Sequence, residues 1–172
     1  EGTPVGEGVL SWEQFPNTGF SKAYNTDWEP PDSAGTMTAI ATGVKSHMGA
    51  IGVSAGERQD CTGSLGRQLL TWLQLADSAG MATGIVSTAR LTHATPAATW
   101  AHAPDRDWEN DTDLPAAAVA EGCIDIARQM VATPWGRGPQ VLLAGGRGEF
   151  MPVVAAAPPY WGKPQPCCRR FP

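Results

Sequence analysis

Apolar and polar positions along the chain follow two different spacings, and each spacing predicts a different element. The small apolar residues 36–44 predict a closely packed helix that ends near Gly43. A longer helix is expected over residues 65–81, with Ser64 as its N-cap and Gly80 at its end. Its apolar residues recur at helical spacing, and they are Leu65, Leu69, Trp72, Leu73 and Ala76.

The second half of the chain adds strands to these helices. Residues 82–91 contain a short apolar run that is typical of a strand covered on both faces. Helical spacing returns over residues 114–131, and residues 139–146 predict a second buried strand. The order helix, strand, helix, strand indicates an α/β fold, in which helices flank a largely parallel sheet.

The two ends of the chain lack this periodicity. Residues 1–31 are irregular, and the pair Pro30-Pro31 predicts an extended entry into the helical region. From residue 153 onward the chain is rich in proline and has no regular spacing. We therefore expect one α/β domain over residues 1–152 and a divergent Pro-rich tail over residues 153–172.

Composition narrows the class of protein. The chain has 172 residues, 42% of them hydrophobic, which suffices for the core of one domain. Its net charge is -5 and its Lys and Arg residues form no cluster, so we expect no nucleic-acid partner. No run of 18 apolar residues occurs, so we expect no membrane span in this chain. The four cysteines permit disulfides without demanding them, and their spacing fits no zinc finger.

Ser33 lies between Asp32 and small residues, at the point where the extended entry becomes a helix. A serine or aspartate in such a place commonly caps the helix and does nothing more. A helix start also favours anions, because its free N–H groups carry partial positive charge. A serine hydroxyl there could attack phosphorus, provided that a base or a metal ion removes its proton. The local sequence leaves both interpretations open.

A second group of polar residues begins where the strand over residues 82–91 ends. This is the edge at which open α/β sheets bind ligands. The segment 88–108 contains His93, Thr95, His102 and Arg106, and Arg106 lies between two aspartates. It could be an ordinary polar loop in which Arg106 pairs with its neighbours. Its planar guanidinium is also well shaped to bind two phosphate oxygens. The third histidine, His47, is expected at the surface.

Two long motifs carry a resemblance to a known family. The stretches "PDSAGTMTAIATGVKSHMGAIGVSA" and "STARLTHATPAATWAHAPDRDWENDTDLPAAAVAEGCIDIA" resemble the alkaline phosphatase family, in the family's own order. The likeness extends from Val9 to Pro152. It implies an incomplete alkaline phosphatase-like α/β domain over residues 1–152, and a metal-dependent phosphomonoesterase with two zinc ions and one magnesium ion.

The resemblance also implies a role for each matching residue. Ser33 would be the nucleophile that becomes phosphorylated, bound to a metal through its oxygen, and Arg106 would bind the phosphoryl oxygens. Asp32 would help to orient that arginine. Thr95 would bind magnesium directly through its hydroxyl, and His93 would lie in the outer shell of the same ion. The substrate implied is a phosphate monoester.

Cys61 and Cys123 match disulfide-forming positions of the animal members, so we expect them to pair in an extracellular, periplasmic or cell-surface protein. The full-length form would be a homodimer. Most of the family's zinc ligands have no counterpart in this chain, so we expect little or no hydrolysis by the fragment. The alternatives are an association-prone structural remnant without catalysis and a metal-free phosphate-binding module.

Overall fold

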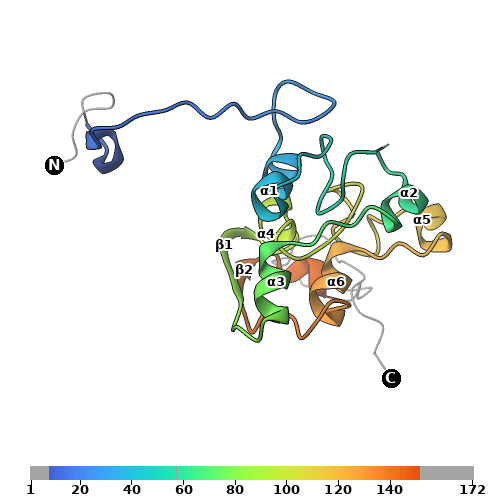
Figure 1. Ribbon diagram of the computed structural model, residues 1–172. Helices are drawn as coiled ribbons and strands as arrows, with labels where there is room; N and C mark the ends of the chain where they lie inside the picture. The colour runs from blue at the N-terminus through green and yellow to red at the C-terminus, as the bar shows by residue number, and fades with distance from the viewer. Residues whose placement is uncertain (1–7, 57, 152–172) are drawn as a thin grey trace, which may run out of the picture.

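The segment that leads into the first α-helix is irregular, as predicted. The computed structural model of the protein describes residues 8–56 and 58–151. Residues 8–24 are exposed, and they include the 3-10 helix η1 (Ser11–Gln14). Figure 1 shows this blue segment running outward from the helices and strands.

The first predicted helix is confirmed, and it begins three residues earlier than its apolar pattern suggests. Helix α1 comprises Ser33–Thr42. Asp32 has extended backbone and its carboxylate accepts a hydrogen bond from the Gly35 N–H, so the helix starts directly after this cap. Gly43 ends it in the left-handed conformation, at φ +77°.

The helix predicted over residues 65–81 is wrong as a single element. The structure has α2 (Cys61–Leu65) and α3 (Trp72–Ser78), and Ser64 lies inside α2 instead of capping a helix. Between them the chain is bound to another segment, because the Leu69 N–H donates to the Gly52 carbonyl. Thr71 and Gln74 then form a reciprocal cap at the start of α3.

The helix predicted over residues 114–131 is also interrupted. Its two parts are α5 (Ala116–Ala120) and α6 (Ile126–Ala132). Gly122 adopts φ +94° between them, which ends α5 and allows the chain to turn. Asp125 caps the second part by accepting a hydrogen bond from the Arg128 N–H.

Both predicted strands are present, and they form a two-stranded parallel sheet. Strand β1 is Gly84–Arg90 and strand β2 is Val141–Gly145. Gly84 pairs with Val141 at the start of the register. Helices α3 and α6 lie beside this sheet in Figure 1, and α1 packs against α3 and α4 (Ala94–Ala97). The predicted α/β class, with a parallel sheet flanked by helices, is confirmed in an incomplete form.

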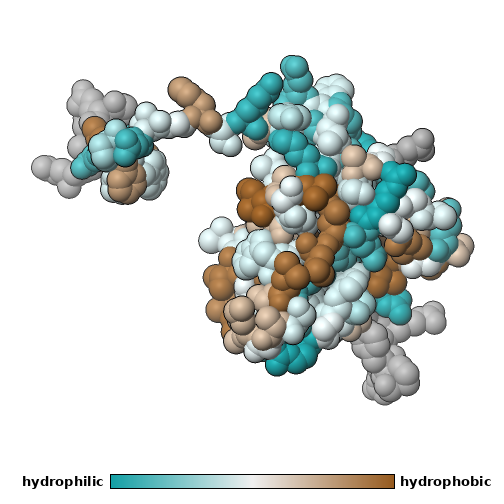
Figure 2. Space-filling model, in the orientation of Figure 1, coloured by the Kyte–Doolittle hydropathy of each residue, from teal (hydrophilic) through white to brown (hydrophobic). Residues whose placement is uncertain are grey.

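The expectation that the strands are covered on both faces is wrong. In β1 only Ile85 is buried, and Val86 is 74% exposed. Every residue of β2 is exposed. The apolar run therefore includes positions that nothing in the described part of the chain covers. Figure 2 shows apolar side chains gathered on the face that carries α1, α3 and the strands.

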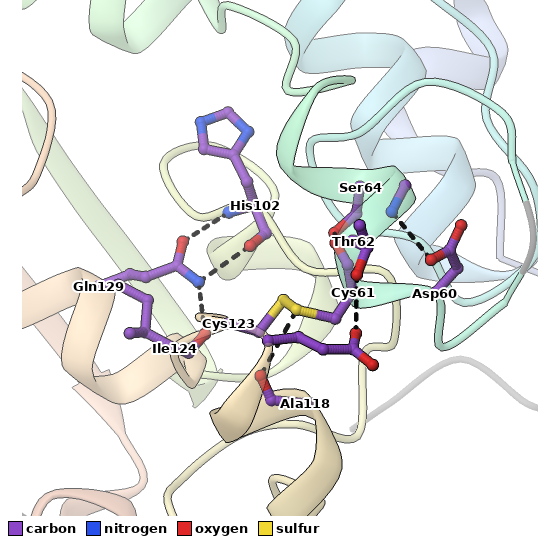
Figure 3. Close-up of a disulfide and its surroundings, with 11 residues drawn as sticks. Asp60, Cys61, Thr62, Ser64, His102, Ala118, Cys123, Ile124 and Gln129 are labelled. Carbon is purple, nitrogen blue, oxygen red and sulfur yellow. Dashed lines mark hydrogen bonds between the residues drawn. A yellow bond between two sulfur atoms is a disulfide. The ribbon is translucent and has the colours of Figure 1, made fainter.

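Two apolar clusters hold the described residues together. The larger contains Trp100 and Ile126, both fully buried, and joins α4 and α6 to β1. The smaller surrounds Cys61 and Cys123, which form the expected disulfide (Figure 3). The expectation that His47 lies at the surface is wrong, because its side chain is buried and its Nδ1 accepts a hydrogen bond from the Gly56 N–H.

After β2 the described chain ends in the 3-10 helix η2 (Arg147–Phe150). The tail predicted over residues 153–172, and the boundary before it, lie outside the described residues. Within residues 8–56 and 58–151, the helices are too short to cross a bilayer.

Candidate active site

Asp32 is the residue on which the start of α1 is built. Its Oδ1 accepts hydrogen bonds from Gly35 N at 2.9 Å and from Asn25 Nδ2 at 3.1 Å. Its Oδ2 accepts from Gly49 N at 3.1 Å and from Arg106 Nη1 at 3.2 Å. Each carboxylate oxygen therefore has two donors, which fixes the direction of the side chain.

These hydrogen bonds also set the charge of Asp32. Burial raises the pKa of its carboxyl, but backbone hydrogen bonds from Gly35 and Ala34, followed by those from Asn25 and Gly49, lower it further than burial raises it. The net pKa lies below the ordinary value of 3.8. Asp32 is therefore ionised at neutral pH, and the stability that it contributes is lost only as the pH falls through its lowered pKa.

Arg106 reaches the start of α1 from a turn 73 residues further along the chain. Its Nη1 lies 2.9 Å from Ser33 Oγ and 3.2 Å from Asp32 Oδ2, so one nitrogen donates to both residues. The ion pair with Asp32 is partly buried, with 25% of the Arg106 side chain exposed. The structure thus brings the predicted serine, aspartate and arginine into one cluster.

His93 closes the other side of the guanidinium. Its Nε2 lies 3.2 Å from Arg106 Nη2. Because a guanidinium only donates, Nε2 accepts and the ring proton lies on Nδ1. This Nδ1 is buried and has no hydrogen-bond partner among the described residues. His93 therefore meets Arg106 directly in this structure.

Among the predicted site residues, Thr95 does not contact the others. It lies in α4 and is exposed. It lines a hollow of about 200 Å³ beside β1, together with Met37 and Trp72. Within the described ranges, its hydroxyl makes no hydrogen bond to Ser33, His93 or Arg106. Four of the five predicted site residues are joined by contacts, and Thr95 is not.

The glycine at the start of α1 leaves room for neighbouring polar groups. A Cβ added to Gly35 would lie 2.3 Å from Asn25 Oδ1 and 3.1 Å from the His47 carbonyl oxygen. The Gly35 N–H is itself bound by Asp32. Gly35 thus makes room for Asn25, and Asp32 already occupies donors that an anion would use. Asn25 had no local signal in the sequence, because it lies in the irregular segment.

The residues present do not fit the metal ions that the resemblance implies. No group of three or more His, Cys, Asp or Glu side chains within the described residues is arranged to bind a metal. Both oxygens of Asp32 already accept two hydrogen bonds, and His93 Nε2 faces a cation. Magnesium requires several hard oxygen ligands, and the Thr95 hydroxyl supplies one.

A sequence model of one protein family, described as alkaline phosphatase, matches residues 1–165. The chain belongs to the alkaline phosphatase family. It is 50% identical over 140 residues to alkaline phosphatase 4 of Drosophila melanogaster, covering 81% of this chain and 23% of that protein. It is 42% identical over 165 residues to the alkaline phosphatase of Gadus morhua, covering 95% of this chain and 34% of that protein. The chain thus spans about a quarter to a third of the length of these relatives.

A solved alkaline phosphatase shares the fold. The enzyme from the Antarctic bacterium TAB5 matches 81% of this chain and 47% of its own, with a TM-score of 0.52 and 24% identity. This likeness supports the α/β class of the alkaline phosphatase chain described above. The sequence comparisons confirm the predicted family, and this structural likeness confirms the predicted fold class.

Proposed function

We propose that this chain carries the nucleophile and the phosphate-binding arginine of a metal-dependent phosphomonoesterase. One observation carries the proposal, namely that Arg106 Nη1 lies 2.9 Å from Ser33 Oγ. A phosphoryl group at Ser33 would have its oxygens beside a permanent cation that donates in two directions. Membership of the alkaline phosphatase family supports the same chemistry.

The reaction proposed for Ser33 has two steps. Its Oγ forms a bond to phosphorus while the bond from phosphorus to the ester oxygen breaks. The hydroxyl proton passes to solvent, and the departing oxygen gains a proton to become an alcohol. Water then cleaves the phosphoserine bond, which restores Ser33 and releases inorganic phosphate. Arg106 holds the phosphoryl oxygens through both steps, and Asp32 keeps the guanidinium in place.

The weak point of this chain is the activation of Ser33. A serine hydroxyl is a poor nucleophile at neutral pH without a base or a metal ion. Among the described residues, the side chain hydrogen-bonded to Ser33 is Arg106, which cannot accept a proton. Two zinc ions and one magnesium ion belong to the proposal for the complete protein, but Ser33, His93 and Thr95 do not make a site for them here.

We therefore expect residues 1–172 to hydrolyse an aryl phosphate at a negligible rate, even with added zinc and magnesium. The physical reason is that Arg106, the side chain hydrogen-bonded to Ser33 among the described residues, only donates and so cannot remove the hydroxyl proton. Release of the phenolate is measured by absorbance, with a full-length relative as the positive control. Turnover approaching that of the full-length enzyme would contradict this expectation.

A metal-free phosphate-binding module is a second candidate function, since the Arg106 and Ser33 contact needs no metal. Calorimetry with inorganic phosphate tests it. Replacing Arg106 with alanine is expected to weaken binding at least tenfold, as for the loss of a charge-assisted hydrogen bond. Arg137→Ala is the control, because Arg137 contacts Asp77 away from this site. Equal losses in the two variants would exclude Arg106 as the binding residue.

The proposed setting of the full-length protein is extracellular, periplasmic or on the cell surface, as a homodimer. The disulfide between Cys61 and Cys123 supports an oxidising compartment. It offers no support for the dimer, which remains an expectation from the family.

A further inference from the structure

Asp105 is a buried carboxyl that the steps above do not use. Its side chain is 1% exposed, and it directly precedes Arg106. Oδ1 accepts a hydrogen bond from Asp107 N at 2.9 Å, and Oδ2 accepts from Gln59 Nε2 at 2.7 Å. The Asp105 carboxylate therefore links the two residues that flank Arg106. It also connects this turn to Gln59, which is remote in the sequence.

The segment that contains Gln59 is held in a rare conformation. Gln59 has φ +59°, a region that residues with a Cβ seldom adopt. Its neighbour Arg58 places Nη2 3.9 Å from Asp105 Oδ2. On the other side, Asp60 caps α2, whose first residue Cys61 is held by the disulfide. The cap and the disulfide thus hold the chain directly after Gln59, and the Gln59 amide donates to Asp105.

We infer that Asp105, held by Gln59, is a positioning residue for Arg106. An arginine side chain is long and loses considerable rotamer freedom when its tip is fixed. The tip of Arg106 must meet Ser33, Asp32 and His93 at once, which requires that its backbone stay in one place. The inference rests on the proposed role of Arg106, since positioning matters only where that guanidinium binds phosphate.

An exchange of donor and acceptor tests this pair. Gln59→Glu sets two carboxylates against each other where the hydrogen bond measures 2.7 Å, and like charges at that distance repel. Adding Asp105→Asn to the same chain restores one donor and one acceptor in reversed order. The two measurements are phosphate affinity by calorimetry and the NMR order parameter of the Arg106 Nε–Hε bond, both on the full chain below its unfolding temperature.

We expect Gln59→Glu to weaken phosphate binding by about tenfold, the effect of losing one hydrogen bond to a charged group. The Arg106 order parameter should fall from its wild-type value to below about 0.6, which marks a flexible bond. The double variant should regain the wild-type order parameter and an affinity within about threefold of wild type. Asp77→Asn is the matched control, because Asp77 is another buried carboxyl with an arginine partner, and it should leave Arg106 ordered.

The outcomes separate this inference from the proposed function. If the wild-type chain binds no phosphate, the proposed role of Arg106 fails, and the order parameters still decide whether Asp105 positions it. A rigid Arg106 in the Gln59→Glu variant overturns the inference. So does a loss that Asp105→Asn fails to restore, since Gln59 would then act through some other contact.

Discussion

Removal of the Cys61–Cys123 disulfide is expected to lower the free energy of unfolding by about 4 kcal/mol. The two cysteines are 62 residues apart, and closing a loop of that length removes much of the entropy of the unfolded chain. The bond also lies inside an apolar cluster with Trp108 and Leu114. Urea unfolding of the double variant Cys61→Ala and Cys123→Ala, compared with the oxidised wild type, measures the difference.

The same double variant distinguishes the effect of this disulfide on stability from any effect of the other cysteines. A reducing agent should destabilise the wild-type chain by nearly the same amount and leave the double variant unchanged. A difference below about 1 kcal/mol between oxidised wild type and double variant would show that the surrounding cluster, rather than the cross-link, holds α2 to α5. Apart from the disulfide, the Cys61 sulfur contacts the Ala118 carbonyl (Figure 3), and the Thr62 hydroxyl donates a hydrogen bond to Glu121.

Local signals were sufficient for α1 and for both strands. Asp32 before small residues and Gly43 after them mark the two ends of α1, and each acts within a few residues of the helix. The strands were found from their β-branched and apolar runs. Their exposure could not be found in this way, because a run such as the one in β2 has the same composition whether or not another element covers it.

The predictions of single helices over residues 65–81 and 114–131 were wrong for a physical reason. The spacing from Leu65 to Leu73 fits one helix, but the chain between them bonds to Gly52 and Val53 through contacts that are remote in sequence. Such tertiary contacts override local propensity. The break before α6 had a signal, since glycine at position 122 is favoured where the backbone must turn left-handed.

The candidate site also contains residues that the sequence predicted and residues that it did not. The motif resemblance predicted Asp32, Ser33, His93 and Arg106, and the structure places all four in contact. Periodicity could not have joined residues 73 positions apart. The partners that orient them were not predicted, because Asn25 and Gln59 lie in irregular segments where polar residues are ordinary.

Gly52 is the position where we expect the most damaging substitution by alanine. Its φ is +59°, and an added Cβ would lie 2.3 Å from the Ala101 carbonyl oxygen and 2.8 Å from His102 Nδ1. Neither group can withdraw easily, because His102 is buried and its Nδ1 bonds back to the Gly52 carbonyl. The left-handed backbone and the overlap together should cost about 3 kcal/mol or more in the free energy of unfolding.

Gly43→Ala provides the matched control for this prediction. Gly43 has a similar φ of +77°, but nothing lies within 4 Å of its added Cβ. It should lose only the cost of the left-handed conformation, about 1–2 kcal/mol. Urea unfolding of both variants isolates the overlap as the difference between them. Equal losses would mean that the chain near Ala101 yields to the added methyl group, so that Gly52 is needed for its backbone conformation alone.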